Sequence, residues 1–302
     1  MEKSSPVDAT VVITTKDRKE DLRTAVQSAI NQTANVEVLV IDDGSSDGTS
    51  AMIHEEFPEV RLHREEESAG LIVRRNQAAK MAQGDIIVSI DDDAEFSSPH
   101  VVEQTLPYFE DSFVGAVGIP FIDVKRDPDT VKQEAPDDSG LYALNSFIGT
   151  AHAIRRDLFL DLGGYRDFFY HQNEEMDLCL RMLDRGKVVM AGHGDHVIHY
   201  KSPIRDHTTL RIYKRRNDLL FSWCNIPGRY LLPHMARKTL SGVLEGIRDR
   251  RIDNFTGILR GFGDSLARFG ERAPVRPQTH ALYQDLKKNG MQPVEKVRPR
   301  LP

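Results

Sequence analysis

The sequence predicts an α/β fold in which helices flank a mostly parallel central sheet, followed by a helical C-terminal extension. Short β-branched runs alternate with amphipathic stretches of about ten to fifteen residues in the first part of the chain, which is typical of βαβ units. Beyond Thr208 the apolar spacing becomes helical as far as about Phe269. We therefore expect a sheet domain over residues 1–207 and a helical, basic region over residues 208–302.

The first half of the chain supplies the elements of this sheet in turn. Apolar and β-branched runs predict strands at 10–15, 36–41, 60–63 and 85–90. Apolar residues at helical spacing predict intervening helices at 17–31, 46–56 and 71–83. Because helices alternate with the strands, the strands are expected to run parallel in one sheet.

The second half is less regular. Its expected elements are strands at 113–119 and 187–191, an apolar segment at 146–154 and a helix at 174–184. Residues 123–140 are polar, contain proline and lack periodicity, which predicts a mobile loop. The last thirty residues hold five prolines and few apolar groups, so an extended or disordered end is expected.

The composition is that of a soluble globular protein. Among the 302 residues, 39% are hydrophobic and 28% are charged. No apolar run is long enough to span a bilayer, and the first ten residues lack the apolar core of a signal peptide. Cys179 and Cys224 form no metal-type cluster, so we expect reduced thiols in a cytoplasmic protein.

Charge is divided unevenly along the chain. The net charge of −6 combines −17 over residues 1–204 with +11 over residues 205–302. A basic region of this kind binds nucleic acid or anionic lipid heads, or lies against the acidic body of its own chain. The intramolecular arrangement is the default expectation, peripheral contact with the inner face of a membrane is the alternative, and no nucleic-acid partner is expected.

Acidic residues directly follow two of the predicted strands. Asp91, Asp92 and Asp93 come after the run 85–90, and Asp42-Asp43 ends the run that begins at Val36. Parallel strands end at the same edge of a sheet, where ligands bind, so both clusters can face one crevice. Two like charges ~4 Å apart repel by about 4 kcal/mol at an effective dielectric of ~20. Either a divalent cation with oxygen ligands compensates this repulsion, or the acids form a simple polar turn after the strand.

Three arginines, Arg18, Arg74 and Arg75, adjoin these acidic turns. Carboxylates accept hydrogen bonds from base or ribose hydroxyls and arginines bind phosphate oxygens, so the set fits a charged, polar ligand. The chain has no Gly-x-x-x-x-Gly-Lys-Ser/Thr phosphate loop, and its first strand leads to residues 15–18 (TKDR) rather than to a glycine-rich dinucleotide-binding turn. A receiver domain would be much shorter and would leave residues 91–93 unexplained.

Short motifs occur in a fixed order along residues 9–220. They are TVVITTKDR at 10–18, VLVIDDGS at 38–45, RN at 75–76, GD at 84–85, DDD at 91–93, GGY at 163–165 and EEMDLCLR at 174–181. In this order and at these spacings they resemble the family 2 glycosyltransferases, which have the GT-A fold. The resemblance implies an inverting transferase that uses a nucleotide-diphosphate sugar and a divalent metal, Mn or Mg.

The resemblance also implies a donor pocket, whose residues are matched position by position. Thr15, Arg18, Asp42 and Asp43 would line the nucleoside pocket, with Arg75 nearby.

The family's Asp-x-Asp motif corresponds to Asp91 and Asp93. Asp93 would be the direct metal ligand, with Asp91 or Asp92 nearer the ribose. His199 lies where some relatives place a histidine that binds metal or diphosphate, although a lone histidine is often structural. The metal would stabilise the departing diphosphate as a Lewis acid.

An inverting transfer also needs a base that removes the proton of the acceptor hydroxyl. The family has Glu-Asp at a helix start where this chain has Glu174-Glu175, so Glu175 is the favoured base and Glu174 the alternative. The alternative to a catalytic role for these glutamates is a structural one. In that case Asn173 caps the helix, and acids in its first turn stabilise it by about 0.3–1 kcal/mol each. Asp177 fits that role better, because Arg181 lies four residues on.

Residues 215–217 (Arg-Arg-Asn) precede an apolar stretch of the C-terminal region. Members of the family often carry a basic-Asn pair here, which favours a role in holding a diphosphate or lipid phosphate over a solvated basic turn. The helices that follow are apolar on one side and basic on another. They are expected either to pack on the catalytic domain or to lie on a membrane surface.

The whole pattern predicts an enzyme of polysaccharide, glycolipid or cell-envelope glycan synthesis, with a glycan, glycolipid or small-molecule acceptor. A sugar nucleotidyltransferase is the enzymatic alternative, but it should show a glycine-rich, Arg-containing loop after the first strand. A non-catalytic nucleotide-sugar-binding protein is the other alternative, and the intact aspartates and the pair Glu174-Glu175 argue against it.

Overall fold

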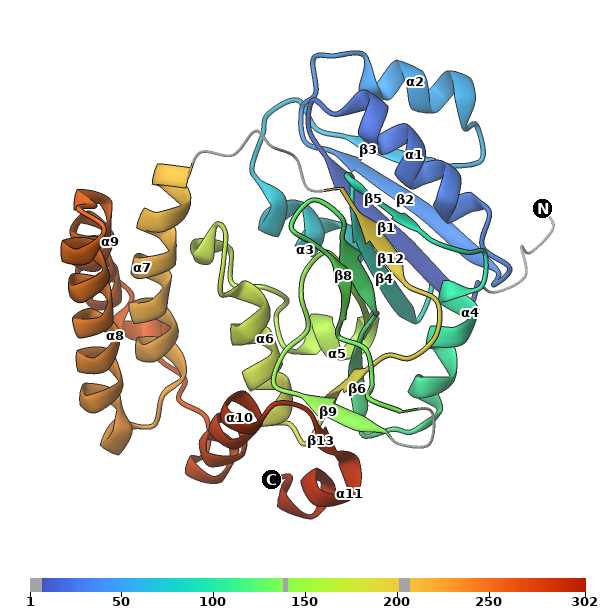
Figure 1. The fold of residues 1–302 in the computed structure, drawn as a ribbon. Helices are drawn as coiled ribbons and strands as arrows, with labels where there is room; N and C mark the ends of the chain where they lie inside the picture. The colour runs from blue at the N-terminus through green and yellow to red at the C-terminus, as the bar shows by residue number, and fades with distance from the viewer. Residues whose placement is uncertain (1–6, 138–140, 201–206) are drawn as a thin grey trace.

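The computed structural model describes residues 7–137, 141–200 and 207–302. Its core is a nine-stranded sheet in the order β13-β9-β11-β6-β10-β4-β1-β2-β3, and a four-stranded sheet has the order β5-β12-β7-β8. Helices flank the central sheet, and the long helices of the C-terminal region stand to one side of it (Figure 1). The predicted α/β class with a helical C-terminal region is confirmed.

The first strands of the chain form the parallel part of the central sheet. They are β1 (Ala9–Thr15), β2 (Val36–Asp42), β3 (Arg61–Arg64) and β4 (Ile86–Asp91). β1 lies between β2 and β4, and all of its residues are buried. Burial on both faces explains why β1 and β4 are largely continuous apolar runs rather than alternating ones.

The connecting helices lie on both faces of this sheet. Helix α1 (Lys19–Ile30) connects β1 to β2, and α2 (Thr49–Glu56) connects β2 to β3. Helix α3 (Leu71–Met81) then connects β3 to β4, which lies on the other side of β1 in the sheet. Because such crossovers are right-handed, the reversal of direction places α3 on the face opposite α1 and α2 (Figure 1). The three helices predicted from sequence are therefore confirmed.

The rest of the central sheet is mixed. Its strands are β10 (Ala151–Arg155), β6 (Val114–Gly118), β11 (Val188–Ala191), β9 (Tyr142–Leu144) and β13 (Gln292–Pro293). In the smaller sheet, β12 (Val197–His199) pairs with β5 (Ala94–Phe96), which directly follows the three aspartates. This pairing brings two segments that are distant in sequence to the same end of β4.

The segment expected to be a mobile loop contains regular structure. Within 123–140, β8 (Asp127–Lys132) pairs antiparallel with β7 (Phe121–Asp123), and residues 138–140 lie outside the described residues. β8 lies at the edge of the smaller sheet and none of its residues is buried, so it lacks the apolar alternation by which a strand is recognised.

The prediction of an extended or disordered C-terminal end is wrong. The last thirty residues include α10 (Pro277–Asn289), β13 and α11 (Val294–Val297). The few apolar residues of α10 gather on one buried face, which includes Leu282, Tyr283 and Leu286. Pro277 stands in the first turn of α10, where proline favours a helix start rather than breaking the helix.

Helices α7 (His207–Asn225), α8 (Gly228–Arg248) and α9 (Ile252–Ala267) pack together. Glycine permits close approach of α9 to α7, since a Cβ atom at Gly257 would lie 2.5 Å from the carbonyl oxygen of Ile212. Within the described part of the chain, no helix is both long enough and apolar enough to span a bilayer.

Candidate active site

The carboxyl ends of β1, β2 and β4 meet at one edge of the central sheet. In the observed register, Thr15 at the end of β1 pairs with Asp42, and Thr14 pairs with Asp91. The expectation that the two acidic turns share one edge is therefore confirmed. A cavity of about 250 Å³ opens there. Its lining residues are Thr14, Thr15, Lys16, Arg18, Asp43, Leu71, Arg74, Asp91, Asp92, Asp93 and His171.

The two aspartates after β2 differ in their surroundings. Asp42 is fully buried and is not among the residues that line the cavity. Its carboxylate accepts hydrogen bonds from the Ser45 backbone N–H (2.8 Å), from Arg64 (3.2 Å) and from the Ser50 hydroxyl. These contacts close the turn after β2, so Asp42 shapes the edge of the site from inside the protein.

Asp43 lines the cavity and holds the segment that leads into α3. Its carboxylate accepts hydrogen bonds from Arg74 Nε (2.6 Å), the Ser68 hydroxyl (2.7 Å) and the backbone N–H groups of Ala69 (2.8 Å) and Gly70 (3.0 Å). Although burial opposes it, these donors hold the pKa of Asp43 below its usual range.

Asp92 connects the end of β4 to the end of β1. It accepts a hydrogen bond from the Thr15 hydroxyl (2.8 Å) and one from Arg18 Nη1 (3.0 Å), and the same Arg18 nitrogen lies 2.8 Å from Asp93 Oδ2. Burial raises the pKa of Asp92 to about 7, against the attraction of Arg18 and the hydrogen bond from Thr15. Arg18 thus supplies positive charge at the floor of the cavity.

Asp91, Asp93 and His199 form a cluster with the geometry of a cation site. One ligand atom of each lies within 4.8 Å of the others, and His199 Nε2 lies 3.2 Å from Asp93 Oδ1. His199 is buried, yet neither ring nitrogen makes a hydrogen bond with the residues that the structure describes. Two carboxylates and an imidazole suit a divalent cation, and a ligand would satisfy the buried ring.

Arg75 links this cluster to Glu175. Its Nη2 donates to Asp91 Oδ1 (2.7 Å) and to the carbonyl oxygen of Gly149 (2.9 Å). Glu175 also approaches Gly149, because a Cβ atom there would be 2.5 Å from Glu175 Oε1 and 2.9 Å from Arg75 Nη1. Burial raises the pKa of Glu175, although Arg75 and the Gly149 N–H oppose the shift. Glu175 is therefore a carboxylate with increased basicity near the cluster of Asp91, Asp93 and His199.

Glu174 is more deeply enclosed than its neighbour. It is 2% exposed, and its Oε2 atom has no hydrogen-bond partner within the described ranges, whereas Glu175 is half-buried. Burial, followed by the charge of Glu175, raises the pKa of Glu174 well above its usual range. The difference in exposure applies to the residues as a whole, since burial raises the pKa of both carboxyl groups.

The turn before these glutamates has an unusual backbone. Tyr170, Gln172 and Asn173 have φ of 62°, 72° and 72°, a region that costs a residue other than glycine about 1–3 kcal/mol. The buried Asn217 side chain on α7 stabilises this turn. Its Nδ2 donates to the carbonyl oxygens of Phe169, His171 and Gln172, each at 2.8 Å.

The first turn of α6 (Glu174–Leu183) differs from expectation at Asn173 and agrees at Asp177. Asn173 stands at the predicted N-cap position of the helix, but its side chain makes no capping hydrogen bond. Asp177 is fully buried and accepts hydrogen bonds from Arg181 Nε (2.9 Å) and Arg166 Nη1 (2.6 Å). The predicted ion pair between Asp177 and Arg181 is confirmed, and it fixes α6 rather than serving the cavity.

The preferred interpretation of residues 215–217 as a phosphate-binding segment does not agree with the structure. Arg215 forms an ion pair with Glu245 on α8, and Arg216 forms one with Asp264 on α9. Arg216 also donates to the carbonyl oxygen of Phe168 (2.7 Å). Both arginines are buried in contacts between helices, so they hold α7 to its neighbours.

Several residues of the site were not predicted from the sequence. Lys16 and Leu71 line the cavity, and the Thr150 hydroxyl donates to Asp91 Oδ2 (2.8 Å). Lys16 lies between two predicted site residues, so its position in the motif could have revealed it. His171 also lines the cavity, and no pattern in the sequence marks it, because its place depends on the turn before α6.

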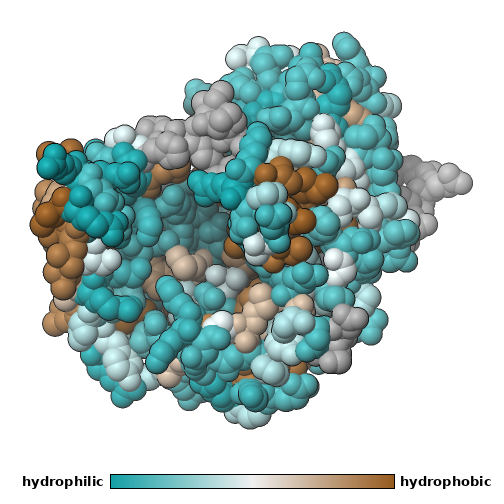
Figure 2. Space-filling view, viewed as in Figure 1, coloured by the Kyte–Doolittle hydropathy of each residue, from teal (hydrophilic) through white to brown (hydrophobic). Residues whose placement is uncertain are grey.

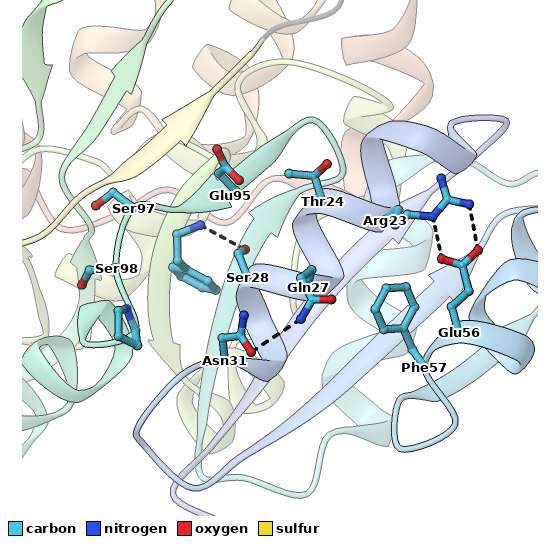
Figure 3. Close-up of a pocket in the computed structure, with 12 residues that line it drawn as sticks. Arg23, Thr24, Gln27, Ser28, Asn31, Glu56, Phe57, Glu95, Ser97 and Ser98 are labelled. Carbon is cyan, nitrogen blue, oxygen red and sulfur yellow. Dashed lines mark hydrogen bonds and ion pairs between the residues drawn. The ribbon is translucent and has the colours of Figure 1, made fainter.

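A second hollow, of about 620 Å³, lies between α1, the end of α2 and β5 (Figure 3). It shares no lining residue with the cavity at the strand ends. Several of its polar side chains pair with one another, since Arg23 Nε donates to Glu56 (2.6 Å) and Gln27 contacts Asn31 (3.5 Å). We therefore place the candidate site at the strand ends.

Comparisons with known proteins identify the family of this chain and proteins that are similar to it. The family model described as "Glycosyl transferase family 2" matches residues 10–163. A glucosyl-dolichyl phosphate glucuronosyltransferase of Haloferax volcanii is 24% identical over 239 residues, which are 72% of this chain and 72% of that relative.

Two solved structures have a similar fold. The mannosyltransferase PcManGT of Pyrobaculum calidifontis, in complex with GDP-Man and Mn²⁺, has a TM-score of 0.58 and 19% identity, covering 93% of this chain and 80% of that one. TarS 1–349 of S. aureus has a TM-score of 0.62 and 12% identity, covering 94% of this chain and 92% of that one. At these identities the structures show a common fold.

Proposed function

The chain belongs to glycosyl transferase family 2, and from this premise we propose that it is an inverting glycosyltransferase. It transfers a sugar from a nucleotide-diphosphate sugar to an acceptor hydroxyl with the help of a divalent cation, Mn or Mg. The observation that carries this proposal is the cluster of Asp91, Asp93 and His199, which Arg75 connects to the carboxylate Glu175.

The donor nucleotide occupies the cavity at the ends of β1, β2 and β4. We assign Thr15 and Asp43, which line this cavity, to the nucleoside, and Asp92, which also lines it, to the ribose. Lys16 and Arg18 supply positive charge for the two phosphates, since guanidinium and ammonium groups bind phosphate oxygens.

Asp91, Asp93 and His199 hold the cation. The buried ring nitrogens of His199 lack hydrogen bonds to described residues, which fits a role as ligands. When bound, a divalent cation supplies positive charge that stabilises the departing diphosphate. Arg75 keeps Asp91 in place, because its guanidinium donates to the carboxylate from the buried side.

Glu175 removes the proton of the acceptor hydroxyl as the hydroxyl oxygen forms a bond to the anomeric carbon. The bond from that carbon to the diphosphate oxygen breaks on the opposite face, the nucleoside diphosphate leaves with the bonding electrons, and the configuration inverts. A raised pKa makes Glu175 a stronger base than a solvated carboxylate. Glu174 is the alternative base.

The acceptor is a hydroxyl of a glycan, a glycolipid or a small molecule. One relative is a glucosyl-dolichyl phosphate glucuronosyltransferase, which supports a lipid-linked acceptor in cell-envelope glycan synthesis. A panel of nucleotide-sugar donors identifies the hexosyl or deoxyhexosyl group that is transferred.

The test is nucleoside-diphosphate release from a panel of nucleotide sugars, with Mn²⁺, with Mg²⁺ and with chelator. We expect release with at least one donor, loss of release on chelation, and loss in Asp93→Ala. Asp111→Ala serves as the matched control, because Asp111 lies outside the cavity. Full activity of Asp93→Ala, or failure to bind any nucleoside diphosphate in a thermal-shift panel, would contradict the proposal.

A further inference from the structure

Helices α8 and α9 carry apolar side chains on the side that faces away from α7. Leu240, Leu244 and Ile247 on α8, and Ile252, Leu259 and Leu266 on α9, are between 57% and 77% exposed. We call these six residues the outer face. Figure 2 shows the apolar surface at the left edge of the molecule, where Figure 1 places α8 and α9.

The outer face follows from the geometry of helix packing. Gly257 and Gly261 of α9 lie directly against α7, because Cβ atoms there would meet its carbonyl oxygens at 2.5 Å and 3.0 Å. At 100° per residue, Ile252, Leu259 and Leu266 fall on the opposite side of α9. Exposed apolar rows of this length are unusual on a monomeric protein and indicate an interaction surface.

The charges around the outer face have one sign. Residues 228–270 hold eight Arg and Lys against four Asp and Glu, a net charge of +4. All four carboxylates, at Glu245, Asp249, Asp253 and Asp264, pair with arginines. Five exposed arginines remain, and none of them forms an ion pair with a carboxylate that the structure describes; they are Arg229, Arg237, Arg250, Arg251 and Arg260.

An apolar strip bordered by unpaired cations matches the chemistry of an anionic bilayer surface. Apolar side chains enter the boundary between head groups and acyl chains, and arginines bind lipid phosphates. A second copy of the chain fits less well, because a two-fold interface on this face would bring the same arginines of both copies together. The undescribed segments hold six residues or fewer each, too few to cover two helices.

We propose that the outer face of α8 and α9 docks on an anionic membrane surface. The inference goes beyond the proposed function and does not depend on it, because it rests on the exposed side chains and charges of a hairpin that contributes no residue to the cavity. It places the protein on the bilayer as a peripheral protein, with α7 between the lipid and the catalytic domain.

The test is co-sedimentation of the full chain with vesicles of phosphatidylcholine alone or mixed with phosphatidylglycerol. We expect binding to the mixed vesicles, weaker binding at high salt, and little binding to neutral vesicles. Leu259→Glu with Leu266→Glu should weaken binding by at least about tenfold. Arg250→Gln with Arg251→Gln should weaken it by about thirtyfold.

Leu141→Glu is the matched control, since Leu141 is also an exposed leucine (42%) but lies far along the chain from the hairpin. It should bind vesicles like the unmodified protein, and circular dichroism confirms that every variant is folded. Two results overturn the proposal: no binding to phosphatidylglycerol vesicles at low salt, or a dimer in sedimentation velocity that the Leu259→Glu and Leu266→Glu pair dissociates. In the second case the outer face binds another copy of the chain. Nucleoside-diphosphate release, which tests the catalytic proposal, is measured separately without lipid.

Discussion

The pair Glu174-Glu175 offers the sharpest test of the proposed mechanism. Replacing either residue by Gln keeps its size and removes its ability to accept a proton. If Glu175 is the base, Glu175→Gln loses catalysis while Glu174→Gln retains it. The two substitutions are matched, because they change adjacent carboxylates in the first turn of the same helix.

The expected sizes differ for the two variants. Removing a general base lowers turnover by about 100–10,000-fold, so kcat of Glu175→Gln should fall within that range. Donor binding should stay nearly unchanged, because Glu175 is not among the residues that line the nucleotide cavity. Glu174→Gln should keep turnover within about threefold, a change worth less than about 1 kcal/mol in the barrier.

The stability of Glu174→Gln should also depend on pH differently from that of the unmodified protein. The folded-state pKa of Glu174 is raised, chiefly by burial, so the folded protein binds its proton more tightly than the unfolded chain does. The stability associated with this proton is present at low pH and is lost as pH rises from the unfolded pKa through the folded pKa. A tenfold difference in proton affinity between the two states corresponds to about 1.4 kcal/mol, so Glu174→Gln should melt higher than the unmodified protein at neutral and alkaline pH.

Turnover is measured as nucleoside-diphosphate release, donor binding by calorimetry, and melting temperature by differential scanning calorimetry from acid to alkaline pH. Loss of turnover in Glu174→Gln with activity retained in Glu175→Gln would reverse the two roles. Full turnover in both variants would refute a base on α6. A melting temperature of Glu174→Gln that follows the unmodified protein at every pH would refute the burial argument.

Three further substitutions test the surroundings of the site. His199→Ala should weaken Mn²⁺ binding by about 10–100-fold in calorimetry, whereas an unchanged affinity would make His199 structural. Gly149→Ala places a methyl group 2.5 Å from Glu175 Oε1, so turnover should fall while donor binding persists; equal turnover would show that this contact does not position the base. Asn217→Ala should lower the free energy of unfolding by about 2–4 kcal/mol, because buried carbonyl oxygens lose their donor. Urea denaturation measures this loss, and a loss below about 0.5 kcal/mol would contradict the reasoning.

The parallel half of the fold could be predicted because its signals are local. Strands such as β4 are buried on both faces and consist of apolar runs, and the acids that follow them must lie at one edge of a parallel sheet. The candidate positions of Asp91 and Asp93 follow from that rule alone. His199 was suggested only by the resemblance, because β12 reaches Asp93 through a pairing with β5 that no local pattern encodes.

Other features depend on contacts between distant segments. Asp42 and Asp43 look equivalent in the sequence, yet one is enclosed in a turn and the other lines the cavity. The C-terminal end is poor in apolar residues, but α10 needs only one buried face, since the rest of its surface is solvated. The left-handed turn before α6 could not be predicted, because residues other than glycine adopt it only when their surroundings hold them there.

The role of residues 215–217 follows from their directions around α7. Three successive helical residues point about 100° apart, and here each contacts a different neighbour: Arg215 contacts α8, Arg216 contacts α9, and Asn217 contacts the turn before Glu174. The hairpin that carries the outer face is thus joined through one helix to the turn that positions the candidate base. If the hairpin docks on a bilayer, these contacts fix the orientation of the catalytic domain to the lipid. A flexible linker would leave that orientation free, whereas the ion pairs of the buried Arg215 and Arg216 hold the hairpin to α7.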